Sequence, residues 1–66
     1  MDAQLLKLIR NIEGYNQYEF ANLIGVSRST IAYIEAGYIP MSPRVYKKII
    51  EAIGHERVEE IKKLIK

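Results

Sequence analysis

The sequence predicts an all-α fold, a compact domain of five short helices. Apolar residues recur, in five successive segments, at the three- and four-residue spacing that places side chains on one helix face. A glycine stands at or just beyond the end of four of these segments, where it can terminate a helix. The sequence has no internal repeat, low-complexity run or linker. We therefore expect residues 1–66 to form one helical domain.

The first helix is expected over residues 3–12, closed by Gly14. Its predicted buried stripe consists of Leu5, Leu6, Ile9 and Ile12. Lys7 and Arg10 interrupt this stripe and should point outward. Because the apolar stretch is short and carries these charges, we expect neither a signal peptide nor a membrane span at the N-terminus.

Residues 17–36, QYEFANLIGVSRSTIAYIEA, predict two short helices joined by a tight turn, which is a helix-turn-helix motif. The first helix should run from about residue 17 to residue 24, with an inward face formed by Phe20, Ala21 and Ile24. Asn16 and Glu19 have the spacing of a capping box, which satisfies free N–H groups at a helix start. Ala21 is small, as a steep crossing of the two helices requires, and Gly25 permits the sharp turn.

The second helix of the motif should begin after Ser27, whose hydroxyl can cap it, and end before Gly37. Val26 is expected to fill the turn, while Ile31 and Ile34 face the first helix. The outer face of this predicted recognition helix holds Arg28, Ser29, Ala32 and Tyr33, which we expect to contact base edges in the major groove. Tyr33 could instead support Arg28 or pack against the neighbouring loop. Arg28 can donate two parallel hydrogen bonds to guanine, and Ala32 can pack on a thymine methyl group.

Two further helices follow the motif. Ser42 and Pro43 form a capping and first-turn pair for a fourth helix that ends at Gly54. Its apolar face should consist of Val45, Tyr46, Ile49, Ile50 and Ile53. A fifth helix is expected over about residues 55–65, with one stripe formed by Val58, Ile61, Leu64 and Ile65.

Composition limits the function classes. The chain of 66 residues is long enough for one small core, and its net charge of +2 is compatible with a polyanionic partner without requiring one. There is no cysteine, and the one histidine, His55, has no accompanying carboxylate pair or phosphate loop. We therefore expect no enzyme activity, metal, cofactor or small-molecule ligand, and a cytoplasmic location.

The segments LLKLIRNIEGY, NQYEFANLIGVSRSTIAYIEAG and KKIIEAIG, with their spacing, resemble the lambda-repressor-like family of helix-turn-helix proteins, also called the xenobiotic response element type. The resemblance covers nearly the whole chain and implies a five-helix domain that binds operator DNA, usually as a dimer on a roughly palindromic site. It also implies which residues contact phosphates, namely Gln17, Ser27, Thr30 and Arg44. Arg10 and Lys47 are weaker candidates for phosphate contacts, and we interpret each as an ordinary solvated charge.

Two apolar segments leave alternatives open. The loop after the recognition helix, often basic and polar in the family, here contains Tyr38, Ile39 and Met41. These residues either fold against the fourth helix or join a protein interface. The stripe of the fifth helix either completes the core of one chain or pairs with a second copy, and we expect a mixed role.

The leading hypothesis is a sequence-specific regulator of transcription, of the small phage or mobile-element repressor type, that binds DNA as a homodimer and lies with the nucleoid. The rival hypothesis is a protein-interaction module on a helix-turn-helix scaffold with little DNA binding. The substitution Arg28→Ala separates them, because a DNA reader would lose its site preference while an interaction module would be indifferent.

Overall fold

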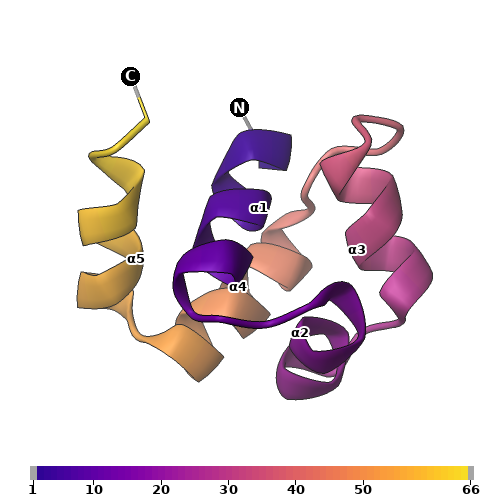
Figure 1. Cartoon of the computed structure of the whole chain (residues 1–66), viewed down its shortest axis with the longest axis horizontal. Coiled ribbons are helices and arrows are strands. Elements are labelled where there is room, and N and C mark those ends of the chain that lie inside the picture. The colour runs from indigo at the N-terminus through magenta and orange to yellow at the C-terminus, as the bar shows by residue number, and fades with distance from the viewer. Residues whose placement is uncertain (1, 66) are drawn as a thin grey trace.

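The computed structural model describes residues 2–65, and within them the chain forms five helices and no strand. The helices are α1 (Asp2–Ile12), α2 (Gln17–Ile24), α3 (Arg28–Glu35), α4 (Pro43–Ile53) and α5 (His55–Lys62). Figure 1 shows α1 in the middle of the molecule, with α3 and α5 on opposite sides of it. α2 packs on α3 and α4, and α4 packs on α5. The all-α, five-helix fold predicted from the sequence is confirmed.

One core joins all five helices. The largest fully buried side chains are Leu6, Ile9, Phe20, Ile31, Ile34, Ile49 and Val58. Each helix contributes at least one of them, because each has apolar residues on a single face. The predicted inward positions of the motif are confirmed, since Ala21 is 2% exposed where α2 meets α3.

The predicted helix starts are confirmed by their hydrogen bonds. Asn16 Oδ1 accepts from the backbone N–H of Glu19 at 2.8 Å, and the Asn16 N–H donates to Glu19 Oε1 at 2.8 Å, which completes the capping box. The Ser27 hydroxyl accepts from the Thr30 N–H, and the Ser42 hydroxyl accepts from the Val45 N–H, each at 3.2 Å. Local side chains therefore fix where α2, α3 and α4 begin.

Two glycines permit sharp changes of direction. Gly25 has φ 77° and ψ 37°, so it ends α2 in the left-handed conformation, and the next residue, Val26, packs against the core. Gly54 has φ 101° and ψ 138°, which a residue with a Cβ rarely adopts. It ends α4 and directly precedes α5, so no loop separates these two helices.

The structure corrects the sequence analysis at two helix ends. Ile12 was predicted to be buried but is 39% exposed, because it is the last residue of α1 and no further turn of that helix covers it. The fifth helix was predicted to reach residue 65 but ends at Lys62. There the N–H groups of Leu64 and Ile65 bond to carbonyls three residues back, at 3.0 and 3.1 Å, in a tighter turn that takes Leu64 out of the apolar stripe.

Candidate nucleic-acid interface

α3 divides its side chains between the core and the surface. Ile31 and Ile34 are 0% and 1% exposed and pack inward, whereas Arg28, Ser29 and Tyr33 are exposed. Ala32 is half-buried beside them. The four predicted base-contacting residues therefore lie on one accessible face of α3, with Arg28 and Ser29 in its first turn.

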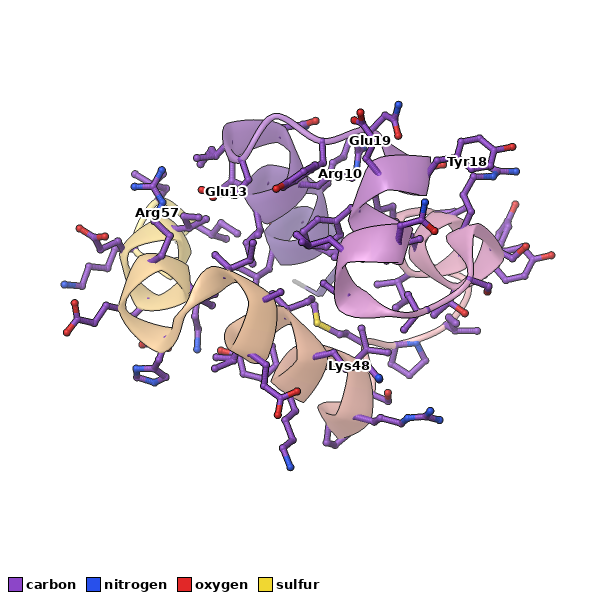
Figure 2. All side chains as sticks on the ribbon, turned by 90° about the horizontal axis from the view of Figure 1, so that it is seen from below. Arg10, Glu13, Tyr18, Glu19, Lys48 and Arg57 are labelled. Carbon is purple, nitrogen blue, oxygen red and sulfur yellow. The ribbon has the colours of Figure 1, made fainter. Side chains whose placement is uncertain are left out.

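Arg28 is held from α2 by two contacts. Its Nη1 donates a hydrogen bond to Gln17 Oε1 at 3.2 Å, and its Cζ lies 4.8 Å from the centre of the Tyr18 ring. The second distance is that of a cation–π contact. Figure 2 shows Tyr18 on α2 at the edge of the molecule, directed away from the core. Tyr18 was not predicted as a site residue, because a single exposed aromatic residue is not part of the apolar spacing that marks a helix face.

Gln17 connects Arg28 to a polar pair behind it. Gln17 Nε2 donates to Glu35 Oε1 at 3.3 Å, and Glu35 accepts two further hydrogen bonds, from Arg10 Nε at 2.7 Å and Arg10 Nη2 at 2.9 Å. We call Arg10, Glu35, Gln17 and Arg28 the polar chain. It runs from α1 through the end of α3 and the start of α2 to the exposed face of α3.

The interpretation of Arg10 as a solvated charge is wrong. Its side chain is only 12% exposed and that of Glu35 only 7%, and Arg10 Nη1 also donates to the Tyr15 carbonyl at 3.0 Å. Hydrogen bonds to Glu35 raise the pKa of Arg10. Burial by itself raises the pKa of Glu35, but hydrogen bonds from Arg10 and Gln17 and the charges of Arg10 and Lys7 outweigh it and lower that pKa. Both groups are therefore charged at neutral pH.

The order of the polar chain fixes the direction of the Gln17 amide. A carboxylate only accepts hydrogen bonds and a guanidinium only donates them. The amide nitrogen must therefore face Glu35, and Gln17 Nε2 lies 3.3 Å from Glu35 Oε1. The amide oxygen must face Arg28, and Gln17 Oε1 lies 3.2 Å from Arg28 Nη1. A glutamate or a lysine at this position would meet one of its neighbours with a like charge.

A hollow of about 270 Å³ lies between the starts of α3 and α4. Three of the four predicted phosphate-contacting residues line it, namely Ser27, Thr30 and Arg44, together with Ser42. The Ser27 and Thr30 hydroxyl oxygens are 2.9 Å apart. A Cβ at Gly25, which also lines the hollow, would lie 3.8 Å from Lys48 Nζ, so a second cation is close. We call this feature the helix-start hollow.

The fourth predicted phosphate-contacting residue, Gln17, belongs to the polar chain rather than to the hollow. Tyr33 has a structural partner of its own, since its ring centre lies 6.1 Å from that of Tyr38. The Tyr38 N–H bonds to the Tyr33 carbonyl at 2.9 Å and the Gly37 N–H bonds to the Ile34 carbonyl at 3.1 Å, a pattern that closes a helix end and brings these two side chains together.

The residues of the two apolar segments are divided between the core and the surface. Met41 packs against the core, whereas Tyr38 is 78% exposed and Ile39 is 40% exposed. Val58 and Ile61, two of the four possible interface residues of the tail, are 0% and 3% exposed within the single chain. They complete its own core and are not accessible to a second copy.

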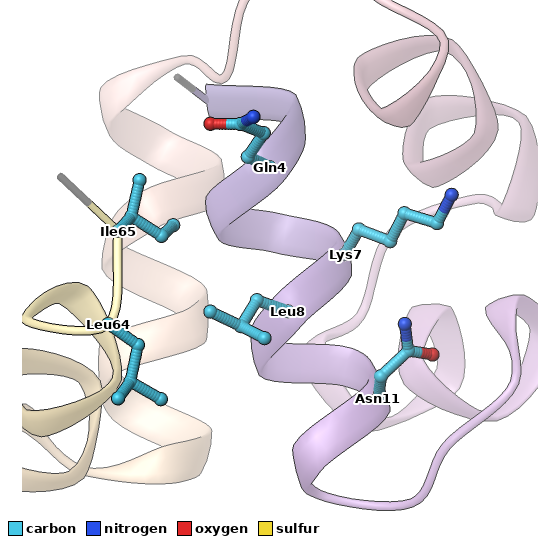
Figure 3. A pocket seen from close by; sticks show the side chains of 6 residues that line it. All are labelled: Gln4, Lys7, Leu8, Asn11, Leu64 and Ile65. Atoms are coloured by element: carbon cyan, nitrogen blue, oxygen red, sulfur yellow. The ribbon is translucent and has the colours of Figure 1, made fainter.

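The other two tail residues line a groove against α1. Figure 3 shows Leu64 and Ile65 facing Leu8, with Gln4, Lys7 and Asn11 along the same helix. The groove encloses about 450 Å³, and Leu64 is 67% exposed. We call these six residues the terminal groove.

Comparison with known proteins identifies the family. A family model described as Helix-turn-helix, of the lambda-repressor or xenobiotic response element type, matches residues 6–64. The comparisons with curated proteins and with solved structures give no significant match. Among residues 2–65, no helix is both long enough and apolar enough to cross a membrane. The match includes the motif, the polar chain and the helix-start hollow, so this chain belongs to the lambda-repressor-like family of helix-turn-helix DNA-binding regulators.

Proposed function

We propose that this protein is a sequence-specific repressor of the small phage or mobile-element type, and that it reads a palindromic operator through the major groove. The observation that carries the proposal is the fixed position of Arg28. An arginine in the first turn of an exposed recognition helix, held by Gln17 and Tyr18, has its side chain ordered before DNA arrives.

The helix-start hollow supports the same proposal for the DNA backbone. Two helix N-termini open toward it, and such ends attract phosphate because their N–H groups and dipoles point outward. Arg44 adds a full positive charge to its lining. With a net charge of only +2, the domain depends on a few placed contacts of this kind rather than on a broad positive field.

A homodimer completes the proposal. The terminal groove is the part of the tail that remains accessible, with Leu64 as its most exposed member. Two recognition helices related by two-fold symmetry would meet successive major grooves about 34–36 Å apart, so the operator would be a palindrome with that spacing.

The test is selection of bound sequences from sheared genomic DNA at about physiological salt. The proposal expects enrichment of one palindromic motif by the wild type and loss of one base preference with Arg28→Ala, worth about 1–3 kcal/mol. Lys63→Ala removes the same charge from the turn after α5 and should keep the motif. Arg44→Ala should weaken binding to all sequences alike and reduce the salt dependence by about one phosphate contact.

One observation favours a second candidate, a protein-interaction module. Tyr38 and Ile39 form an exposed apolar pair in the loop after α3. If the folded wild type retained no DNA, the double variant Tyr38→Ser, Ile39→Ser would test this surface by loss of partner capture. Met41 is unsuited to that test, because it packs against the core.

A further inference from the structure

Tyr18 is an exposed aromatic residue whose position has no explanation in the core. It is 65% exposed and lies on the second residue of α2, whereas the buried face of that helix consists of Phe20, Ala21 and Ile24. Its ring faces the guanidinium of Arg28, with 4.8 Å between the ring centre and Cζ.

The contact with Tyr18 restrains a motion of the Arg28 guanidinium that its hydrogen bond to Gln17 leaves free. A single bond from Nη1 fixes one corner of the guanidinium, about which the plane can still tilt. A ring against the guanidinium limits that tilt. Together the two contacts from α2 restrain both the position and the tilt of the Arg28 head group.

The plane of the guanidinium decides which base it can recognise. Arginine reads guanine by two parallel, coplanar hydrogen bonds to O6 and N7, so a tilted guanidinium loses one of them. Only Nη1 of Arg28 is committed to Gln17. The remaining edge, formed by Nε and Nη2, carries the donor pair that such a bidentate contact needs.

We propose that Tyr18 is a positioning residue that sets the base preference of Arg28. The inference rests on the proposed DNA-reading function and adds a specificity determinant on α2, outside the recognition helix. It assigns the effect of Tyr18 to discrimination at one base pair rather than to general affinity for DNA.

The experiment compares the wild type with Tyr18→Leu and Tyr18→Phe by selection from a duplex library with a randomised core. Binding constants are then measured on the enriched duplex and on duplexes changed at one base pair. Tyr18→Leu removes the aromatic face and keeps apolar volume, while Tyr18→Phe keeps the ring and removes only the hydroxyl. We expect Tyr18→Leu to reduce the preference at the base pair read by Arg28 by about two- to five-fold, and Tyr18→Phe to retain it.

A double-variant cycle links the effect to Arg28. In the background of Arg28→Ala, the change Tyr18→Leu should have no further effect on preference at that base pair. The chemical shifts of the Arg28 side-chain protons, measured by NMR of the free protein, test the contact without DNA. The ring current of residue 18 should shift them in the wild type and in Tyr18→Phe but not in Tyr18→Leu. Thermal unfolding should be nearly unchanged, since Tyr18 is mostly exposed.

Several results would overturn the inference. An equal loss of affinity for every duplex would show that Tyr18 contacts the DNA backbone itself, and an unchanged preference would show that the ring has no role in reading. A gain in affinity would mean that Tyr18 competes with DNA for Arg28. A wild type that enriched no motif would overturn the proposed function together with this inference, whereas a motif that Tyr18→Leu left intact would overturn the inference alone.

Discussion

α1 is joined to its neighbours by different chemistry on two of its faces. Toward α3, Arg10 forms a two-pronged ion pair with Glu35, and the polar chain continues from there to Arg28. Toward the chain end, Leu8 lies across the terminal groove from Leu64 and Ile65. The first face has directional contacts, which fix angles, whereas the second has apolar side chains, whose packing is non-directional. The directional contacts are therefore the ones that lead to Arg28, the residue proposed to read DNA.

The largest expected effect comes from breaking the polar chain at its buried end. Glu35→Ala leaves the guanidinium of Arg10 nearly buried without its counter-charge, which costs about 3–5 kcal/mol when one partner of a buried pair is removed. That loss equals the whole stability expected of so small a core, about 3–5 kcal/mol. The free energy of unfolding would then be near zero, so we expect circular dichroism at 25 °C to show about half of the molecules unfolded.

The matched control for Glu35→Ala is the double variant Arg10→Met, Glu35→Leu, which removes both charges and keeps apolar volume. It should fold, because no charge is then left unpaired. A melting curve of Glu35→Ala that coincided with that of the wild type would contradict the structural role given to this pair.

A smaller loss of stability, again from the pair of Arg10 with Glu35, is expected at acid pH. Because the folded state lowers the pKa of Glu35, the stability that this carboxylate contributes is complete above its ordinary value of 4.5. It is lost as the pH falls through the lower folded-state value. Urea unfolding between pH 7 and pH 3 should therefore show a steeper loss for the wild type than for Glu35→Gln, and equal slopes would contradict the assignment.

Cutting the polar chain at Gln17 should affect recognition more than folding. Gln17→Leu removes the bonds to Arg28 and Glu35, each worth about 0.5–1.5 kcal/mol. We expect the site preference of the proposed DNA binding to fall by about two- to ten-fold, as measured by competition between the selected duplex and one changed at a single base pair.

The smallest effect on folding is expected at the terminal groove. Leu64→Asp changes a side chain that is 67% exposed, so the free energy of unfolding should move by less than about 0.5 kcal/mol. If the groove joins two copies, sedimentation equilibrium without DNA should show a shift from dimer to monomer. Leu23→Asp on α2, where Leu23 is 42% exposed, serves as the control. A dimer that persisted in Leu64→Asp would exclude the groove as the interface.

The sequence predicted nearly all of the fold because its signals are local. Capping by Asn16, Ser27 and Ser42 and the turn at Gly25 depend only on neighbouring residues, and each was confirmed. The predicted end of α5 was wrong. The apolar spacing continues to Ile65, but the N–H groups of Leu64 and Ile65 bond to carbonyls three residues back rather than four, so the α-helix does not continue. Helix ends depend on which bonds form, not only on which residues could line up.

The site was only partly predictable. The exposure of Arg28 and Tyr33 follows from helical spacing. Ser27, Thr30 and Arg44, which the family resemblance assigns to phosphate contacts, line one hollow, and their phosphate contacts stay a prediction. The pair of Arg10 with Glu35 was missed because the two residues are 25 positions apart and meet only after α1 and α3 pack. No local pattern distinguishes such an arginine from one that is solvated.

The direction of the Gln17 amide limits how this scaffold could evolve. The amide oxygen of Gln17 faces position 28. A side chain at position 28 that donates a hydrogen bond can therefore bond to this oxygen, whereas a carboxylate there cannot, because both groups are acceptors. Turning the amide round would place its oxygen against the carboxylate of Glu35. If Arg28 reads DNA as proposed, a change of base preference through another donor at position 28 needs one substitution, whereas a purely accepting side chain there also needs changes at positions 17 and 35.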